Sequence, residues 1–260
     1  MLTGVQPDRI QRLYGGDLSE VLLLQRGDGQ AVVAKGGPSA GTEAQMLREL
    51  AAAGVPVPAV EAEYGDVLLI EYVEADEAFT PRAWADIGAQ VRALHRHLGD
   101  SYGWPVDYSF GSVRLDNKPG EDWPSFWGEQ RLVETAGLLD RPWRERVERL
   151  AGRIDDLLPK RPPASLLHGD LWAGNMLLMD GRLAAFIDPA CYYGHCEVDL
   201  AMICLFGRPD AAFWDAYGPL EPGWEQRRPI YQLFPALVHL RLFGASYAPL
   251  VERLLATARA

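Results

Sequence analysis

Two short polar motifs with a hairpin signal between them constrain this chain more than any other feature. The first motif, HGDLWAGN, covers residues 168–175, and the second, IDP, covers residues 187–189. Between them lie two apolar runs joined by Asp180 and Gly181, a dipeptide that favours a two-residue β-hairpin turn. A hairpin brings its two ends together, so we expect the second motif to return towards the end of the first.

The spacing of the two motifs fits phosphoryl transfer from ATP. In kinase catalytic loops, an Asp two positions after a His takes the proton of the substrate hydroxyl, and an Asn five positions further on binds magnesium. Asp170 and Asn175 have this spacing, and Asp188 falls where a second magnesium-binding carboxylate is needed. Each residue alone is typical of a turn or a cap. Together they predict that Asp170 is catalytic and that Asn175 and Asp188 bind Mg²⁺.

Composition indicates a globular protein and excludes some partners. Hydrophobic residues make up 48% of the 260 positions, and the net charge is −11 without a basic run. Nucleic acid and anionic membranes need clustered Lys and Arg, so we expect neither as a partner. The chain lacks a signal-like N-terminus, a run of about 18 apolar residues and an even number of cysteines, which predicts a cytoplasmic protein.

The order of predicted elements indicates an α+β, bilobal protein-kinase-like fold. Strand-like runs at residues 18–25, 31–35 and 67–70 and one helix fill the first seventy or so residues, and helices dominate the rest. We expect a small β-rich, nucleotide-binding lobe at residues 1–73 and a larger, mainly helical catalytic and substrate-binding lobe at residues 74–260. The hinge between them is expected at residues 71–73, where the backbone of Glu71 and Val73 would contact adenine. The helices are predicted at residues 42–53, 80–98, 122–139, 142–158, 197–206, 224–243 and 247–258.

A lysine and a glutamate in the first lobe fit an ATP-phosphate site. Lys35 ends the run VVAK, which is close to the strand-borne Val-Ala-Ile-Lys pattern of kinases. Glu43 shares the inward face of the following helix with Leu47 and Leu50, so we expect it to pair with Lys35. Glu49 is the alternative partner, although its spacing points it to another face. A lysine after three apolar residues is otherwise an ordinary strand end.

The glycine signal for a phosphate loop is weaker. Residues 15–20, GGDLSE, lack the full G-x-G-x-x-G pattern, and two adjacent glycines are often only a turn. If the loop does cover phosphates, Gly16 and Ser19 are the residues that we expect to contact them.

Further residues near the motifs are candidates for support of the site or for substrate contact. Asp199 opens a helix, where a carboxylate favours the helix dipole, or else it accepts hydrogen bonds from the catalytic loop; we expect it and His168 to support the site. His195 lies shortly after the second motif and is a candidate for substrate contact. Cys191, His195 and Cys196 lack a CxxC spacing and a fourth ligand, so we expect no zinc.

The chain resembles the fructosamine kinase (ketosamine 3-kinase) family, within the aminoglycoside phosphotransferase-like group of the protein-kinase fold. The motif at residues 168–175 and the run IDPACYYGHCEVDLAM at residues 187–202 carry the resemblance. Aminoglycoside and choline kinases share the His, Asp and Asn, but they usually lack the Trp and the Tyr-Tyr-Gly-His run. The resemblance covers nearly the whole chain and is weakest over the first thirty residues, where the phosphate loop departs from the usual Gly-Gly-Ser pattern.

This resemblance implies ATP- and Mg²⁺-dependent phosphorylation of O3 of a ketosamine such as fructosyl-lysine or ribulosyl-lysine, in protein deglycation. It implies Asp170 as general base, Asn175 and Asp188 as magnesium ligands, and Lys35 on the phosphates with Glu43 as its partner. Trp172 would cover the apolar face of the sugar, a role that indole rings can take, although packing beside the loop is the alternative.

Some alternatives stay open at the level of the sequence. A kinase for an aminoglycoside, choline or another amino alcohol would use the same Asp170 and metal ligands. A pseudokinase that only binds nucleotide is disfavoured by the joint presence of the catalytic, metal-binding and phosphate-binding residues. The expected partner is a small ketosamine or a glycated protein lysine, and the chain is expected to be a monomer or a homodimer.

Overall fold

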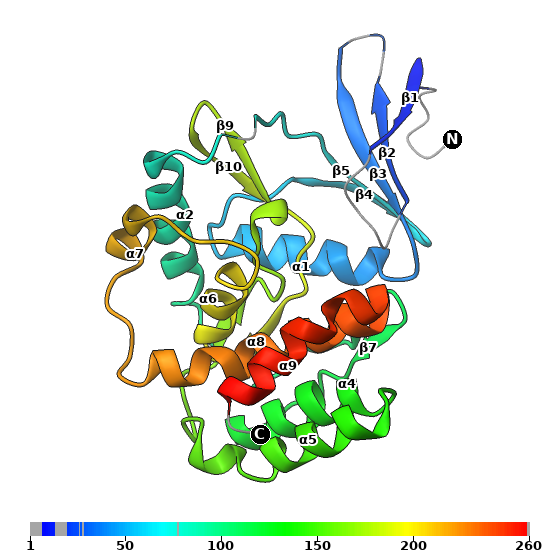
Figure 1. Ribbon diagram of the computed structural model, residues 1–260. Helices are drawn as coiled ribbons and strands as arrows, with labels where there is room; N and C mark the ends of the chain where they lie inside the picture. The colour runs from blue at the N-terminus through cyan, green and yellow to red at the C-terminus, as the bar shows by residue number, and fades with distance from the viewer. Residues whose placement is uncertain (1–6, 14–19, 26, 28, 77, 259–260) are drawn as a thin grey trace. The chain divides into compact units, whose positions relative to one another are not determined.

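The computed structural model describes residues 7–13, 20–25, 27, 29–76 and 78–258 (Figure 1). The chain forms two compact units. Unit 1 combines Met1–Leu94, Ala173–Ala190 and Pro209–Tyr217, and unit 2 combines His95–Trp172, Cys191–Arg208 and Gly218–Ala260. Unit 1 thus contains the N-terminal sheet together with segments beyond the boundary expected after Val73, and a lobe division at that residue stays a prediction.

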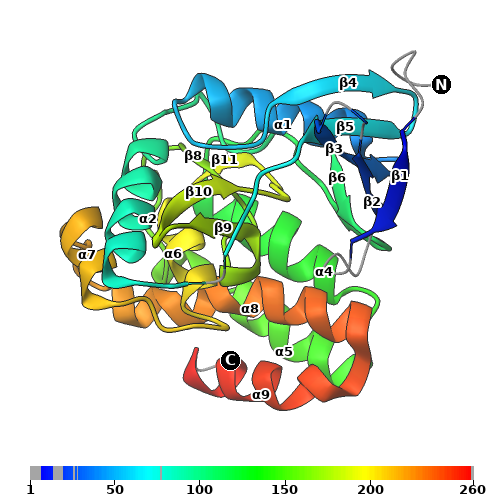
Figure 2. The ribbon, with the colours of Figure 1, turned by 90° about the horizontal axis from the view of Figure 1, so that it is seen from above.

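Unit 1 contains a five-stranded antiparallel sheet with the strand order β1-β2-β3-β5-β4. Its strands are β1 (Arg9–Arg12), β2 (Glu20–Gln25), β3 (Ala31–Gly36), β4 (Val60–Tyr64) and β5 (Val67–Glu71). Helix α1 (Ala40–Ala52) lies along this sheet (Figure 2). Apolar side chains of α1 and the central strands form one core cluster, which includes Leu23, Val33, Ala44, Leu47, Leu68 and Ile70.

The predicted strands at residues 18–25, 31–35 and 67–70 correspond to β2, β3 and β5, and the helix predicted at 42–53 is α1. Residues 18 and 19 lie outside the described part of the chain. The edge strand β4 was not expected from the sequence. Its residues, VEAEY, are half-buried or exposed, so the strand has no apolar run to reveal it.

The predicted hairpin is confirmed. Strands β9 (Met176–Met179) and β10 (Arg182–Phe186) pair antiparallel. Asp180 and Gly181 both have positive φ, 52° and 68°, as a type I′ turn requires. At the base of the hairpin, Ile187 N donates to Asn175 O at 3.0 Å. The backbone therefore joins the end of the first motif to the start of the second.

Helix α2 (Pro81–Leu94) begins within one residue of the predicted start and ends earlier than expected from the sequence. Thr80 Oγ1 accepts a hydrogen bond from Ala83 N at 3.1 Å. Helix α7 (Ala211–Tyr217), which the sequence did not predict, packs side by side with α2 (Figures 1 and 2). A seven-residue helix is too short to show a clear amphipathic period.

The close approach of α2 and α7 depends on a glycine, and we expect Gly88→Ala to destabilise the protein. A Cβ at position 88 would lie 2.3 Å from Phe213 O, so the helices would have to move apart. We expect the free energy of unfolding to fall by about 1–3 kcal/mol, despite the better helix propensity of Ala. Urea unfolding measures this.

Gly41→Ala is the matched control, because a Cβ there would lie 3.8 Å from Glu63 Oε2, an ordinary contact. We expect that variant to be as stable as the parent or more stable by up to about 1 kcal/mol. Equal stability of the two variants would contradict the packing argument.

Unit 2 is mainly helical. Helix α3 (Trp123–Ser125), a π-helix (Phe126–Val133) and α4 (Glu134–Ala136) follow one another without a break, where one helix at 122–139 was predicted. The helix predicted at 142–158 is α5 (Arg141–Ala151), followed by a 3-10 turn at Ile154–Asp156. Those predicted at 197–206, 224–243 and 247–258 are α6 (Glu197–Ile203), α8 (Trp224–Phe243) and α9 (Ala248–Thr257). Helices α8 and α9 lie side by side (Figures 1 and 2).

Two small antiparallel pairs complete unit 2. Strand β8 (Ser165–Leu167), which leads into the catalytic-loop motif, pairs with β11 (Tyr192–Gly194). Strands β6 (Tyr108–Phe110) and β7 (Val113–Leu115) form a second pair. Strands of three residues are too short to show the alternation that identifies strands, and none of the four was predicted.

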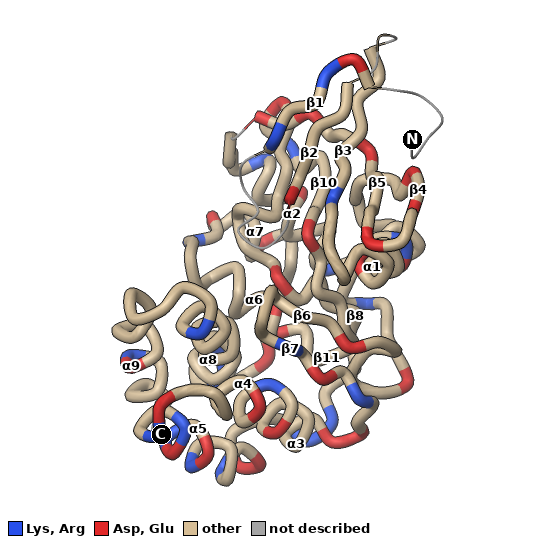
Figure 3. Tube along the Cα trace, turned by 90° about the vertical axis from the view of Figure 1, so that its right-hand side faces the viewer, with Lys and Arg blue, Asp and Glu red and all other residues tan. Residues whose placement is uncertain are grey.

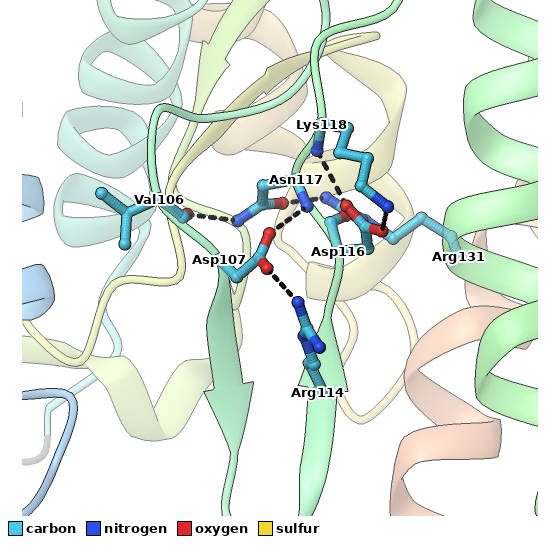
Figure 4. A network of polar contacts seen from close by, with 7 residues as sticks. All are labelled: Val106, Asp107, Arg114, Asp116, Asn117, Lys118 and Arg131. Carbon is cyan, nitrogen blue, oxygen red and sulfur yellow. Dashed lines mark hydrogen bonds and ion pairs between the residues drawn. The ribbon is translucent and has the colours of Figure 1, made fainter.

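A buried cation anchors the loop around β6 and β7 (Figure 4). Arg131 has no exposed surface, and its guanidinium donates to Asp116 O and to Asn117 Oδ1, both at 2.6 Å. The guanidinium carbon lies 4.3 Å from the centre of the Tyr192 ring. Asn117 in turn donates from Nδ2 to Val106 O at 3.1 Å. Burial lowers the pKa of Arg131, and the carbonyl acceptors and aromatic faces around it replace part of its lost hydration.

Candidate active site

In unit 1, one buried lysine joins two carboxylates. Lys35, on the central strand β3, has 7% of its surface exposed, and its Nζ forms an ion pair with Glu43 Oε1. The same Nζ lies 2.5 Å from Asp188 Oδ1. The predicted pairing of Lys35 with Glu43 is therefore present, whereas Glu49 is exposed. The contact with Asp188 was not foreseen, because the two residues are 153 positions apart.

The local structure explains how these groups meet. Strand β3 pairs with β2 and β5 on its two sides, which fixes the position of Lys35 near the end of the strand. Helix α1 starts at Ala40 and carries Glu43 in its first turn, on the face that packs on the sheet. Asp188 follows the hairpin directly. Both carboxylates thereby reach one ammonium group.

The two carboxylates of this cluster keep the buried lysine charged. Burial alone lowers the pKa of Lys35, but the charges of Glu43 and Asp188 outweigh it, so the pKa of Lys35 is raised and the group stays protonated. Burial raises the pKa of Glu43, Lys35 opposes this rise, and Asp188 adds to it. The result is a fixed positive charge beside two carboxylates, of which only Asp188 is substantially exposed, with 40% of its side chain accessible.

Asp188 and Asn175 have the donor atoms that a magnesium ion prefers, carboxylate and amide oxygens. Asp188 adopts a φ of 54°, in the left-handed region that Asp and Asn tolerate better than most residues. Asn175 is buried with 5% of its surface exposed and ends the 3-10 turn Ala173–Asn175. The hydrogen bond from Ile187 N to Asn175 O keeps their backbones together. The chemistry of these donors fits Mg²⁺.

In unit 2, Asp199 holds the backbone of the catalytic-loop motif. Its fully buried carboxylate accepts hydrogen bonds from His168 N at 2.8 Å and from Gly169 N at 2.9 Å. His95 Nε2 lies 3.2 Å from Asp199 Oδ2. These are the backbone contacts expected from the sequence for Asp199, whereas its contact with His95 was not predicted. Its pairing with a residue 104 positions away has no local signal.

We expect Asp199→Asn to lower the free energy of unfolding by about 2–3 kcal/mol, because an amide has one acceptor oxygen for two loop N–H groups and its NH₂ faces donors. Urea unfolding measures the change. Asp210→Asn is the matched control: Asp210 is exposed, and its Oδ1 accepts from Ala212 N at 2.9 Å, which Asn can also do. We expect it within about 0.5 kcal/mol of the parent. Similar losses in both variants would show that Asp199 has no special supporting role.

Asp170 and Trp172, later in the catalytic-loop motif, are both accessible to solvent. Asp170 is half-buried, and its backbone N donates to His168 Nδ1 at 3.3 Å. Gly169 has a φ of 82°, a conformation that glycine adopts without strain. Trp172 is exposed to 36%, so its ring is available to a ligand.

His195 has the surroundings of a core residue. Its ring is completely buried, with Nδ1 2.7 Å from the Tyr231 hydroxyl oxygen. Burial, with the nearby positive charge of Arg227, lowers the pKa of His195 to about 3. A neutral ring without exposed surface offers no contact to a substrate in this structure. The substrate contact suggested by the sequence therefore forms no part of the function proposed below.

The other predicted nucleotide contacts are less defined. Gly16 and Ser19 lie outside the described residues. Glu71 ends β5, is exposed, and accepts a hydrogen bond from Ala59 N at 3.1 Å through its side chain. Val73 is half-buried. Their contacts with adenine stay predictions.

Of the predicted residues, the structure thus joins Lys35, Glu43 and Asp188 in unit 1, with Asn175 in the same unit. His168, Asp170, Trp172, His195 and Asp199 belong to unit 2. Lys and Arg are scattered among the acidic residues along the described trace (Figure 3). None of the helices in the described part of the chain has the length and apolar character needed to span a bilayer.

Comparison with solved structures identifies the fold as that of protein-kinase-like phosphotransferases. Three aminoglycoside phosphotransferase structures, 16–17% identical to this chain, match with TM-scores of 0.64–0.65 and are covered to 92%. They match 97–99% of this chain. The expected α+β, bilobal kinase-like fold class is confirmed at this level.

The chain belongs to the fructosamine kinase family, whose model matches residues 3–259. A probable ketoamine kinase from Enterococcus faecium is 36% identical over 82% of this chain and 80% of its own length. A chloroplastic protein-ribulosamine 3-kinase from Arabidopsis thaliana is 31% identical over 70% of this chain and 59% of its own length. A crystal structure of a Thermobifida fusca protein assigned as a fructosamine-3-kinase has 33% identity and a TM-score of 0.89, over 100% of this chain and 96% of that one.

Proposed function

We propose that this protein uses ATP to phosphorylate a sugar hydroxyl of a ketosamine, with O3 as the acceptor, and so acts in protein deglycation. Fructosyl-lysine and ribulosyl-lysine are the proposed substrates. Membership of the fructosamine kinase family supports the reaction class. The observation that carries the proposal is the buried Lys35 with its two carboxylates, Glu43 and Asp188, an arrangement suited to nucleotide phosphates.

We propose roles for Asp170, Asp199, Lys35 and Trp172. Asp170 takes the proton of the acceptor hydroxyl, and Asp199 fixes the backbone before it through His168 and Gly169. Lys35 contacts the nucleotide phosphates, and its permanent charge stabilises the negative charge on the transferred group. Trp172 covers the apolar face of the sugar ring.

Asn175 and Asp188 would hold Mg²⁺. When bound, the ion neutralises charge on the nucleotide phosphates. The two residues supply oxygen donors, and the side chain of Asp188 is 40% exposed although one of its oxygens contacts Lys35. The backbone hydrogen bond from Ile187 N to Asn175 O, next to the left-handed Asp188, supports the pairing of these two donors.

A substrate panel tests the proposal. Turnover of ATP is measured by mass spectrometry of products with fructosyl-lysine, ribulosyl-lysine, an aminoglycoside and choline as acceptors. We expect a phosphorylated ketosamine in at least one of the first two reactions and none from the others. Phosphorylation of the aminoglycoside or choline alone would make the protein a kinase of other amino alcohols, the alternative that shares Asp170 and the metal ligands.

We also propose that the protein acts in the cytoplasm, as a monomer or a homodimer. A cytoplasmic location agrees with the three cysteines, Cys191, Cys196 and Cys204, none of which forms a disulfide in the described part of the chain. Whether the acceptor is a free amino acid or a protein lysine is decided by comparing glycated lysine with a glycated protein in the same assay.

A further inference from the structure

Exposed aromatic rings gather next to the catalytic-loop motif in unit 2. We define the aromatic strip as Trp172, Phe206, His239, Phe243 and Tyr247. Three of its members are among the exposed large hydrophobic residues, with 36% of Trp172, 42% of Phe206 and 39% of Phe243 accessible. Single exposed apolar side chains are ordinary, but a contiguous set of them marks a binding surface.

The rings of the strip touch in sequence. The ring centres of Trp172 and Phe206 are 6.4 Å apart, and those of Phe206 and His239 are 4.8 Å apart. From His239 the contacts continue to Phe243 at 5.4 Å and to Tyr247 at 5.0 Å. The strip therefore runs without interruption from the residue two positions after Asp170 to the end of α8 and the turn that follows it.

The middle ring of the strip carries no charge. His239 Nδ1 donates to Pro235 O at 2.8 Å, which fixes its tautomer. Burial lowers the pKa of His239, so the ring is neutral at physiological pH. Arg241, close to it on α8, donates from Nη1 to Thr135 O at 3.3 Å. The faces of the strip are thus neutral rings, which attract a cation and pack well against methylene groups.

We propose that the aromatic strip binds the alkylamine chain of the ketosamine and so determines which glycated amines the enzyme accepts. This inference rests on the proposed function. If Trp172 covers the sugar, the alkyl group on the ketosamine nitrogen extends from the sugar past the Trp172 ring and contacts Phe206. A lysine side chain offers methylene groups and a secondary ammonium, the two features that aromatic faces recognise.

The test compares a substrate that carries the alkylamine group with one that has the same sugar without it. We compare kcat/KM for Nε-fructosyl-lysine with kcat/KM for 1-amino-1-deoxyfructose, which has the same sugar and an amine without a chain. In Phe206→Ala and in Phe243→Ala, we expect the ratio of the two constants to fall by about 3- to 30-fold, mainly through a higher KM for fructosyl-lysine. Leu138→Ala, at a residue 80% exposed elsewhere in unit 2, is the control and should keep the parent ratio.

The outcomes are distinguishable. If the parent protein phosphorylates neither compound, the proposed function fails. If it phosphorylates both but the two Ala variants keep the parent ratio, the strip is only packing and this inference is wrong. Should an Ala variant not fold in thermal unfolding, Phe206→Leu and Phe243→Leu keep apolar bulk, and a ratio reduced by about 2- to 5-fold is then the supporting result.

Discussion

Asp170→Asn is expected to lower kcat by about 10³-fold while leaving nucleotide binding close to that of the parent protein. The amide keeps the size of the side chain but cannot take a proton, and a positioned general base contributes about 10²- to 10⁴-fold to such a reaction. Because the loss affects the transition state, the Kd for ATP should change by less than about 3-fold. Steady-state kinetics with a ketosamine and calorimetric titration of ATP measure the two quantities.

Asp156→Asn is a suitable control, because Asp156 is an exposed aspartate of unit 2 on the 3-10 turn after α5. We expect its kcat to equal that of the parent. A kcat for Asp170→Asn within a factor of about 3 of the parent value would refute the role of general base.

Asp188→Ala should reduce turnover by about 10²- to 10³-fold and raise the magnesium concentration needed for half-maximal activity. The substitution removes the most exposed carboxylate of the cluster and one of the two partners of Lys35. The measurement is activity, and separately nucleotide affinity, as a function of magnesium concentration.

Because residue 188 has a positive φ, Asp188→Ala changes backbone strain as well as charge, and a second variant is needed to separate the two effects. With a φ of 54°, residue 188 is strained when it is Ala, whereas Asn tolerates the left-handed region. Asp188→Asn therefore isolates the loss of charge, and we expect it to share the higher magnesium requirement at nearly parental stability. A magnesium dependence identical to that of the parent in both variants would show that Asp188 is not a metal ligand.

The parts of the site that the sequence predicted are those with a local signal. The Asp180-Gly181 turn, the strand that ends near Lys35 and the helical face that carries Glu43 all follow from residues within about one turn or one hairpin. Family membership also followed from contiguous motifs, and the fructosamine kinase model matches nearly the full chain.

The features that were missed depend on contacts between distant segments or on elements too short to recognise. The pairing of Lys35 with Asp188 and that of His95 with Asp199 join residues 153 and 104 positions apart. Strands β8 and β11 have three residues each and gain their stability from pairing with one another. The π-helix Phe126–Val133 carries Arg131, whose buried guanidinium contacts Asp116 O and Asn117 Oδ1, 15 and 14 positions earlier in the chain.

The tip of the β9–β10 hairpin is bonded to the segment that starts α2. Gly181 O accepts from the Thr80 hydroxyl at 2.9 Å, and Asp180 N donates to Asp76 Oδ2 at 2.9 Å. Opening the hairpin therefore breaks these two bonds to the segment before α2. We expect amide protons of the hairpin and of the start of α2 to exchange with solvent in a single cooperative event, so the β9–β10 hairpin should share the local stability of a segment 101 positions earlier in the chain.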